Sequence, residues 1–298
     1  MPFTIQPNMR IGNLLASASD FFESSGCFFG HGTDNAWDEA VFLLLWAMDL
    51  DEDPGESVLS ERIGQLQAKK FEEAINLRAS EKIPAPYITG EAWFCGLRFS
   101  VDQNVLVPRS PIAELIQNAY RPWITKHPRK ILDLCCGSGC IGIAAAISDQ
   151  EAEVILADLS SDALVIAQKN IDRYRLSSRV KTSCGDLFAP LTGESFDLIL
   201  ANPPYVNAVD LADMPMEYRQ EPTIGLGSGE EGLDISIKIL QTAGRFLNDG
   251  GVLILEVGNS WISLERAYPE FPFTWIEFSQ GGWGVCAITK EELETFTF

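Results

Sequence analysis

Three carboxylates and one amide lie where consecutive apolar segments end, and these residue types at this spacing could do chemistry. Asp133, Asp158 and Asp186 each lie at or near the end of a short apolar segment, and Asn202 directly follows a fourth. If the segments are parallel strands, their carboxyl ends share one edge of a sheet and the four side chains converge there. Carboxylates attract cations and accept hydrogen bonds from hydroxyl and amino groups, although each alone is equally well a helix N-cap or a solvated residue.

A glycine-rich turn follows the first of these acids. Residues 131–142 (ILDLCCGSGCIG) run from an apolar segment through this turn into a helical pattern, where a ligand can approach the backbone and the free N–H groups of a helix start. Gly137, Gly139 and Gly142 also satisfy the dinucleotide-binding pattern GxGxxG, and Asp158 lies 21 residues after Gly137, where such an enzyme holds a ribose. A dehydrogenase and a purely structural turn are therefore alternatives.

Asp133 favours a different cofactor. S-adenosyl-L-methionine carries an amino-acid end and a cationic sulfonium, and a carboxylate beside the glycines suits these better than it suits a pyrophosphate. Asp158 would accept hydrogen bonds from ribose hydroxyls, and Asp186 from the adenine amino group, with Leu187 against the ring. The predicted cofactor-binding residues are Asp133, Cys135, Gly137, Gly139, Asp158, Asp186, Leu187 and Asn202.

Asn202 opens the sequence Asn-Pro-Pro-Tyr (residues 202–205), which suits methyl transfer to a planar nitrogen. Amide and aryl-amine nitrogens are poor nucleophiles because their lone pair is delocalised, so an enzyme must aim that lone pair at the methyl donor. The Asn202 side-chain carbonyl and the Pro203 backbone carbonyl can each accept one hydrogen of an NH2 group, and Tyr205 can stack on the substrate. The predicted catalytic residues are Asn202, Pro203 and Tyr205; the alternative is a proline-rich turn that only ends a strand.

The elements that would position these residues change in character along the chain. Residues 1–86 are predicted to form a helical substrate-recognition domain, and residues 87–110 a β-hairpin linker that turns near residues 102–104. Residues 111–298 alternate apolar strands with amphipathic helices, which predicts an α/β domain with a doubly wound, mostly parallel sheet. Its first strands are expected at residues 130–134, 153–157, 180–183 and 196–201.

The charge excludes some classes of partner. The chain has 22 Lys and Arg against 42 Asp and Glu, a formal net charge of −20, which disfavours nucleic acid and anionic membranes and favours a basic protein partner. Eleven of the acids lie in residues 11–61, which contain no Lys or Arg. Seven cysteines and the lack of a leader or membrane span indicate a cytoplasmic, soluble protein with reduced thiols. Because His31 and His127 are the only histidines, no metal site is expected.

Longer motifs extend along nearly the whole chain. Besides the glycine-rich turn and residues 202–205, they are residues 29–39 (FGHGTDNAWDE), 92–96 (AWFCG), 105–112 (VLVPRSPI), 217–222 (EYRQEP) and 256–259 (EVGN). With these motifs the chain resembles the HemK-like class I methyltransferases that carry an NPPY motif. The resemblance implies a Rossmann-like domain with a mixed seven-stranded sheet, a small helical N-terminal domain and a hairpin linker.

The resemblance also implies a reaction. Residues 29–39 and 92–96 are similar to the branch that methylates the side-chain amide nitrogen of a glutamine in the third large-subunit (50S) ribosomal protein, before or during ribosome assembly, with S-adenosyl-L-methionine as cofactor. A release-factor glutamine methyltransferase, a nucleic-acid amino methyltransferase and a non-catalytic assembly factor are the alternatives. The chain departs from the family pattern at Cys136, where Thr is expected, and at Gln220, where His is expected. Arg109 is expected to support the site, and the long acidic 206–231 loop to act as a lid or binding segment.

Overall fold

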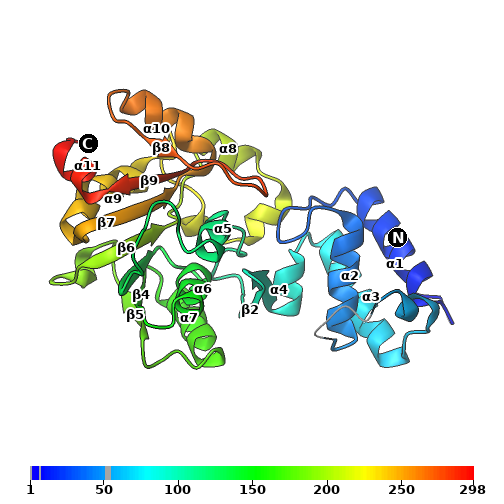
Figure 1. Cartoon of the computed structure of the whole chain (residues 1–298). Coiled ribbons are helices and arrows are strands. Elements are labelled where there is room, and N and C mark those ends of the chain that lie inside the picture. The colour runs from blue at the N-terminus through cyan, green and yellow to red at the C-terminus, as the bar shows by residue number, and fades with distance from the viewer. Residues whose placement is uncertain (1, 7, 51–54) are drawn as a thin grey trace. The chain divides into compact units, whose positions relative to one another are not determined.

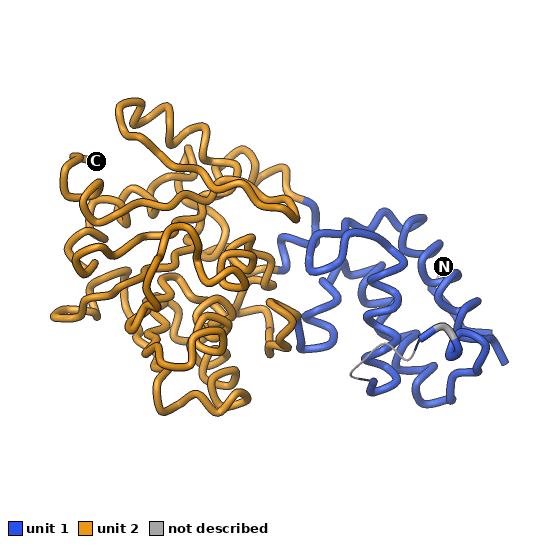
Figure 2. Tube along the Cα trace, viewed as in Figure 1, with its two compact units in different colours: residues 1–92, 215–220 blue, residues 93–214, 221–298 orange. Residues whose placement is uncertain are grey.

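The computed structural model describes residues 2–6, 8–50 and 55–298. Residues 51–54, which belong to the acidic stretch 11–61, lie outside the described residues. The chain forms two compact units: a helical unit of residues 1–92 and 215–220, and a sheet unit of residues 93–214 and 221–298 (Figure 2). Part of the 206–231 loop therefore packs with the helical unit, although residues on both sides of it in the sequence belong to the sheet unit.

The helical unit is built on an apolar core between its helices. Asn35 caps α2, because its side chain accepts a hydrogen bond from the Asp38 N–H, and the acids of the first turn favour the positive end of the helix dipole. Phe22, Leu43 and Phe71 from three different helices are fully buried in the core. The elements of this unit before the hairpin are α1 (Ile11–Ser24), α2 (Ala36–Ala47), the 3-10 turn η1 (Glu56–Ser60), α3 (Gln65–Ser80) and α4 (Ala85–Thr89).

The sheet unit contains a seven-stranded mixed sheet in the order β5-β4-β3-β6-β7-β9-β8 (Figure 1). The five strands from β5 to β7 are parallel, whereas β9 runs antiparallel to both β7 and β8. The mixed seven-stranded α/β fold expected from the sequence is thus confirmed. The strands are β3 (Lys130–Leu134), β4 (Glu153–Asp158), β5 (Val180–Cys184), β6 (Phe196–Ala201), β7 (Leu247–Glu256), β8 (Thr274–Trp275) and β9 (Val285–Thr289).

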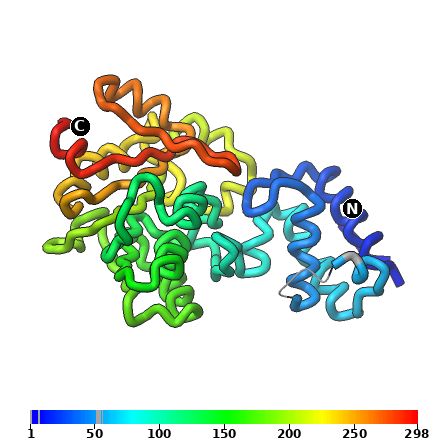
Figure 3. Tube along the Cα trace, viewed as in Figure 1, coloured from blue at the N-terminus to red at the C-terminus, as the bar shows by residue number. Residues whose placement is uncertain are grey.

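Helices cover both faces of this sheet. Because side chains alternate along a strand, Ile131 packs with α5, α6 and α7, whereas Leu132 packs on the opposite face with α9, α10 and α11. In Figure 3, where colour follows residue number, the C-terminal strand β9 runs beside β7. The helices are α5 (Ile112–Gln117), α6 (Cys140–Ser148), α7 (Ser161–Arg173), α8 (Ala208–Asp213), α9 (Asp234–Ala243), α10 (Trp261–Ala267) and α11 (Lys290–Thr295). In the described part of the chain, no helix is both long and apolar enough to cross a membrane.

The hairpin turns earlier than the sequence suggested. Strands β1 (Glu91–Phe94) and β2 (Leu97–Ser100) are joined by Cys95 and Gly96, whose φ angles of 51° and 73° suit a two-residue hairpin turn. The prediction of a hairpin turn at residues 102–104 was wrong. Asp102 does form a turn there, since its side chain accepts a hydrogen bond from the Asn104 N–H at 2.9 Å, but this turn follows the hairpin.

Candidate functional site

The strand order places the candidate site at one edge of the sheet. Chain order reverses between the neighbouring strands β3 and β6, and ligands of doubly wound sheets bind outside the carboxyl ends of strands at such a reversal. The register aligns these ends, because Leu134 pairs with both Ala157 and Ala201, and Ala201 pairs with Leu255. The glycine-rich turn and residues 202–205 therefore leave the sheet at the same edge and on adjacent strands.

Asp133 is the most deeply buried acid of the cofactor set, with 1% of its surface exposed. Its Oδ2 accepts a hydrogen bond from the Gly142 N–H at 2.7 Å, and glycine permits this approach because a Cβ at position 142 would lie 2.8 Å from Asp133 Cβ and 2.9 Å from Oδ2. Oδ1 is buried and has no hydrogen-bond partner among the described residues. Burial raises the pKa of Asp133 to about 7, with Asp158 adding to the rise and the Gly142 N–H opposing it. Asp133 thus offers a buried, unused acceptor.

Asp158 shapes the glycine-rich turn. Its carboxylate accepts hydrogen bonds from the Gly137 N–H and the Ser160 N–H, each at 2.8 Å. Burial nevertheless raises its pKa above the ordinary value. Cys135, Gly137 and Gly139 all have φ angles between 54° and 75°, so the turn is left-handed at three alternate positions. No described atom lies within 4 Å of a Cβ built on Gly137, so this part of the backbone is open to a ligand.

Asp186 and Leu187 follow β5. Asp186 is exposed, and Leu187 is half-buried with a φ of 47°. Burial, followed by the charges of Asp158, Asp133 and Asp186, raises the pKa of the Cys135 thiol. All three predicted acids therefore lie within electrostatic range of Cys135.

Asn202 and Pro203 directly follow β6. Tyr205, two residues later, contacts the segment after β7 through both its backbone and its ring. Asn202 is half-buried and Pro203 is buried. The Tyr205 carbonyl accepts a hydrogen bond from Ser260 Oγ at 2.6 Å. Its ring lies against Gly258, where a Cβ would come within 2.4 Å of ring atom Cε2. The Asn-Pro-Pro-Tyr segment is therefore packed against the segment that follows β7.

Glu256 is a functional candidate to which the sequence analysis assigned no role. It ends β7, is 4% exposed, and accepts hydrogen bonds from Tyr205 Oη at 3.3 Å and from Ser110 Oγ at 2.5 Å. Burial raises the pKa of Glu256 to about 7, although the two hydroxyls and Arg109 act to lower it. The sequence does show an acid at the end of an apolar strand, within the motif at residues 256–259, and this could have indicated a role for Glu256. Its partner Ser110 could not be identified in the same way, because it lies 146 positions earlier in the chain.

Arg109 holds the 206–231 loop. Its Nη1 and Nη2 donate to the two oxygens of Glu221, each at 2.6 Å, and the Glu221 side chain is fully buried. Glu221 also accepts a hydrogen bond from the Val107 N–H at 2.9 Å. This paired geometry ties the segment preceding α5 to Glu221 of the loop that follows Asn-Pro-Pro-Tyr, and both of these parts belong to the sheet unit.

No group of three or more His, Cys, Asp and Glu side chains in the described part of the chain could hold a metal ion. His127 is exposed and pairs with Asp149 at 3.0 Å, while His31 is buried with its ring centroid 4.5 Å from that of Tyr218.

Comparison with known proteins decides between the alternatives for this site. The methyltransferase small domain model matches residues 115–217. A ribosomal protein uL3 glutamine methyltransferase from Francisella tularensis is 44% identical over 272 residues, covering 91% of this chain and 87% of its own. Another, from Bordetella pertussis, is 40% identical over 293 residues, covering 97% and 98%. The chain belongs to the ribosomal protein uL3 glutamine methyltransferase family.

Membership of the uL3 glutamine methyltransferase family makes this chain a methyltransferase and not a dehydrogenase. Among solved structures, a methyltransferase from Pyrococcus furiosus covers 65% of this chain and 88% of its own at 19% identity, with a TM-score of 0.46, a likeness too distant to carry a conclusion. Of the two departures from the family pattern, Cys136 is buried beside the turn, and Gln220 donates to the Glu81 carbonyl at 3.2 Å.

Proposed function

We propose that this protein transfers a methyl group from S-adenosyl-L-methionine to the side-chain amide nitrogen of a glutamine in ribosomal protein uL3. The observation that carries the proposal is the identity of 44% and 40%, over nearly the full chain, to two proteins named for methylating uL3 glutamine. The chemistry of the site supports the proposal, because its two parts follow the adjacent strands β3 and β6. One part is the glycine-rich turn beside the buried Asp133, and the other is an amide followed by two prolines and an aromatic ring.

The residues around the glycine-rich turn fit this cofactor. When bound, S-adenosyl-L-methionine supplies an electrophilic methyl group on a cationic sulfonium. The unpartnered Oδ1 of Asp133 would accept a hydrogen bond from the amino end, which removes the cost of leaving a buried acceptor unsatisfied. Asp158 retains lone pairs for ribose hydroxyls beyond its two backbone bonds, and Asp186 and Leu187 would hold the adenine. The backbone of Cys135, Gly137 and Gly139 would contact the cofactor.

Asn202, Pro203 and Tyr205 would prepare the glutamine amide for attack. The Asn202 and Pro203 carbonyls would each accept one amide hydrogen, which directs the nitrogen lone pair and stabilises the positive charge that develops on nitrogen. Neither proline has an N–H that could compete, and their restricted φ angles keep the carbonyls in place. The amide nitrogen would gain the methyl group as the S–CH3 bond of the sulfonium breaks and a neutral thioether is left, and it would release one proton to water. Most of the rate enhancement would come from orientation and electrostatics.

The charge of the protein suits a basic protein as substrate. Asp210, Asp213, Glu230 and Glu231 are exposed in the 206–231 loop, and they add to the acidic stretch 11–61. Negative surfaces of this kind favour encounter with a lysine- and arginine-rich protein and repel nucleic acid and anionic lipid. We assign substrate recognition to the helical unit together with this loop. A ribosomal protein as substrate would place the reaction in the cytoplasm.

Methyl transfer to competing acceptors tests the proposal. The full-length protein is incubated with isotopically labelled S-adenosyl-L-methionine and, in separate reactions, with purified uL3, a peptide chain release factor or ribosomal RNA. We expect label on uL3 alone. Label on the release factor would support the related glutamine reaction instead, label on RNA would indicate a nucleic-acid methyltransferase, and binding of uL3 without label would indicate an assembly factor; each of these results contradicts the proposal.

A further inference from the structure

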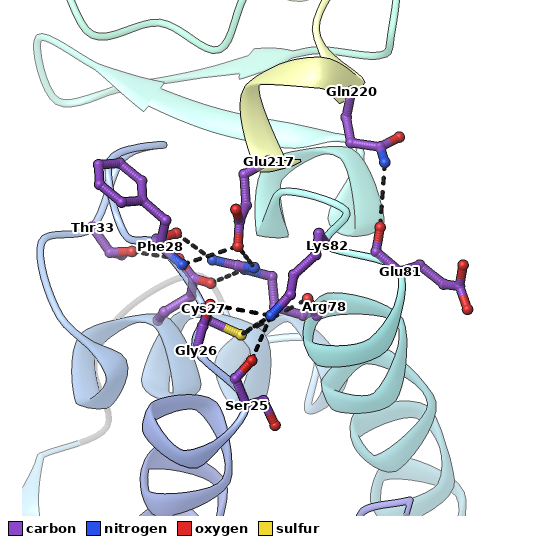
Figure 4. Close-up of polar contacts among 11 residues, drawn as sticks. Ser25, Gly26, Cys27, Phe28, Thr33, Arg78, Glu81, Lys82, Glu217 and Gln220 are labelled. Atoms are coloured by element: carbon purple, nitrogen blue, oxygen red, sulfur yellow. Dashed lines mark hydrogen bonds and ion pairs between the residues drawn. The ribbon is translucent and has the colours of Figure 1, made fainter. Parts of the chain in front are cut away.

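A buried arginine in the helical unit holds a piece of the 206–231 loop. Arg78, at 1% exposure, donates from Nη1 to Glu217 Oε1 at 2.9 Å and from Nη2 to the Phe28 carbonyl at 2.6 Å (Figure 4). Its Nε also pairs with Glu39. Glu217 Oε1 also accepts a hydrogen bond from the Phe28 N–H at 2.9 Å. Residues 215–220 therefore belong to the helical unit through a charged contact in its interior.

Aromatic and backbone contacts on both sides of Glu217 hold the same piece. The ring centroid of Tyr218 lies 5.7 Å from that of Phe28 and 4.5 Å from that of His31. Gln220 donates to the Glu81 carbonyl at the end of α3, as Figure 4 shows. Contacts of Glu217, Tyr218 and Gln220 therefore fasten this piece to the helical unit.

Several of the residues that contact residues 217–220 belong to the 29–39 motif or are its neighbour Phe28. His31 and Glu39 are both buried, and Thr33 Oγ1 donates to Glu39 Oε2 at 2.7 Å while Glu39 pairs with Arg78. Gly30 has no room for a side chain, since a Cβ would lie 2.9 Å from Phe28 and 3.0 Å from Tyr218 Oη. Side chains as buried as His31 and Glu39 do not face a protein substrate, so these two residues of the motif have an internal task.

The two ends of the same loop are fastened within the sheet unit. Val206 donates to the Leu226 carbonyl at 2.8 Å and forms a bridge with Gly227. Glu221, which directly follows residues 215–220, forms two hydrogen bonds with Arg109. The loop therefore begins beside Tyr205, passes through the helical unit at residues 215–220 and returns to an anchor in the sheet unit.

We propose that Arg78 and Glu217 are positioning residues for methyl transfer: the 29–39 motif of the helical unit holds the 206–231 loop through them, and the loop in turn holds the substrate side of the site next to Tyr205. The catalytic part of this inference rests on the proposed function. The anchoring part stands on the contacts alone.

Substitution of Glu217 tests the proposal better than substitution of Arg78. Arg78 lies between two carboxylates, so replacing it leaves two buried negative charges and is expected to unfold the helical unit. Glu217→Gln instead leaves Arg78 paired with Glu39, and it keeps a side-chain carbonyl that can accept from the Phe28 N–H. Burial raises the pKa of Glu217, but the Phe28 N–H and Arg78 more than offset this and lower it overall, so the carboxylate is charged at neutral pH.

Hydrogen exchange and kinetics of the full-length protein test the inference. Glu217→Gln should raise amide exchange about tenfold in residues 206–214 and 221–228, as expected for the loss of a charge-assisted hydrogen bond. It should lower kcat/KM for uL3 about tenfold and leave the dissociation constant for the cofactor unchanged. Glu151→Gln is the matched control, because it removes the same charge from an exposed position just before β4, at the sheet edge opposite the site, and should change neither quantity.

Two results would overturn the inference. One is faster exchange confined to residues 215–220 with normal kcat/KM, which would make Glu217 only a local structural contact. The other is an equal effect of Glu151→Gln, which would make the change of net charge alone responsible. If the wild-type protein fails to methylate uL3, the proposed function falls, but exchange outside residues 215–220 still decides whether Glu217 anchors the loop.

Discussion

Glu256 occupies an unusual position for an acid. It is buried at the end of β7, its pKa is raised to about 7, and both of its oxygens accept hydrogen bonds from hydroxyl groups. The ionised form accepts the bonds of Ser110 and Tyr205 together, while burial opposes ionisation. The carboxylate therefore fixes the Tyr205 hydroxyl at some expense of stability, a common compromise where a side chain must be held for function.

The pH dependence of stability follows from the direction of this pKa shift. Burial raises the folded pKa of Glu256 to about 7, so between the ordinary value of 4.5 and pH 7 the folded protein retains a proton that the unfolded chain releases. The contribution of this group to stability is thus fully present below pH 4.5 and falls as the pH rises to 7. Glu256→Gln cannot ionise and should avoid this loss.

Urea unfolding at pH 5 and pH 8 measures the effect. Relative to wild type, Glu256→Gln should gain about 2–3 kcal/mol between the two pH values, by the conversion of pKa units into free energy. Asp133, whose pKa burial also raises to about 7, is present in both proteins and cancels in the comparison. A difference between variant and wild type that stays constant with pH would show that Glu256 does not titrate in this range.

At the residue scale, the sequence predicted groups that lie close to a strand end and missed those that act across the chain. Asp133, Asp158 and Asn202 follow from the position of apolar segments and glycines. The partners Ser110 and Glu256 are 146 positions apart, and Arg78 and Glu217 are 139 apart. No local spacing connects such pairs, because only the packed fold brings them together.

The segment after β7 is the element that holds Tyr205 in place. It begins with the 3-10 turn η6 (Gly258–Ser260), in which Gly258 has a φ of 45° and makes room for the Tyr205 ring. Ser260 of the same turn donates to the Tyr205 carbonyl. This turn therefore sets the position of the aromatic ring that would pack on the substrate amide.

Gly258→Ala tests this role of the turn, with Gly250→Ala as the matched control. Both glycines have positive φ angles, so each substitution strains the backbone by about 1–2 kcal/mol. Only at Gly258 does the new Cβ meet the Tyr205 ring; no described atom lies within 4 Å at Gly250. Steady-state kinetics should show kcat/KM for uL3 lowered by about 10²-fold for Gly258→Ala alone. Equal losses for both variants would attribute the effect to backbone strain.

At the element scale, strands with strong apolar character were predicted well. The expected strands at 130–134 and 196–201 match β3 and β6, because continuous apolar runs bounded by polar residues are typical of buried parallel strands. The hairpin turn was misplaced, since Asp102 and Asn104 are stronger turn formers by type than Cys95. Gly96 was the signal that could have located it.

On the scale of the whole molecule, the least predictable feature is the path of the 206–231 loop. Its length and acidic residues suggested a lid or binding segment, but nothing in its composition indicates that residues 215–220 pack with helices formed by the first 92 residues. Glu217 is an ordinary acid in the sequence and becomes distinctive only when Arg78 is found buried beside it. The contacts of His31 with Tyr218 and of Glu39 with Arg78 likewise explain why the 29–39 motif contains these residues.

Tandem mass spectrometry of uL3 after incubation with S-adenosyl-L-methionine tests the central claim most directly. Wild-type protein should place one methyl group on a glutamine side-chain amide. Asn202→Ala should reduce this product about 10²- to 10³-fold, the usual loss for one preorganised hydrogen-bond partner, while calorimetry shows cofactor binding retained. A methyl group on another kind of side chain, or undiminished product with Asn202→Ala, would contradict the account.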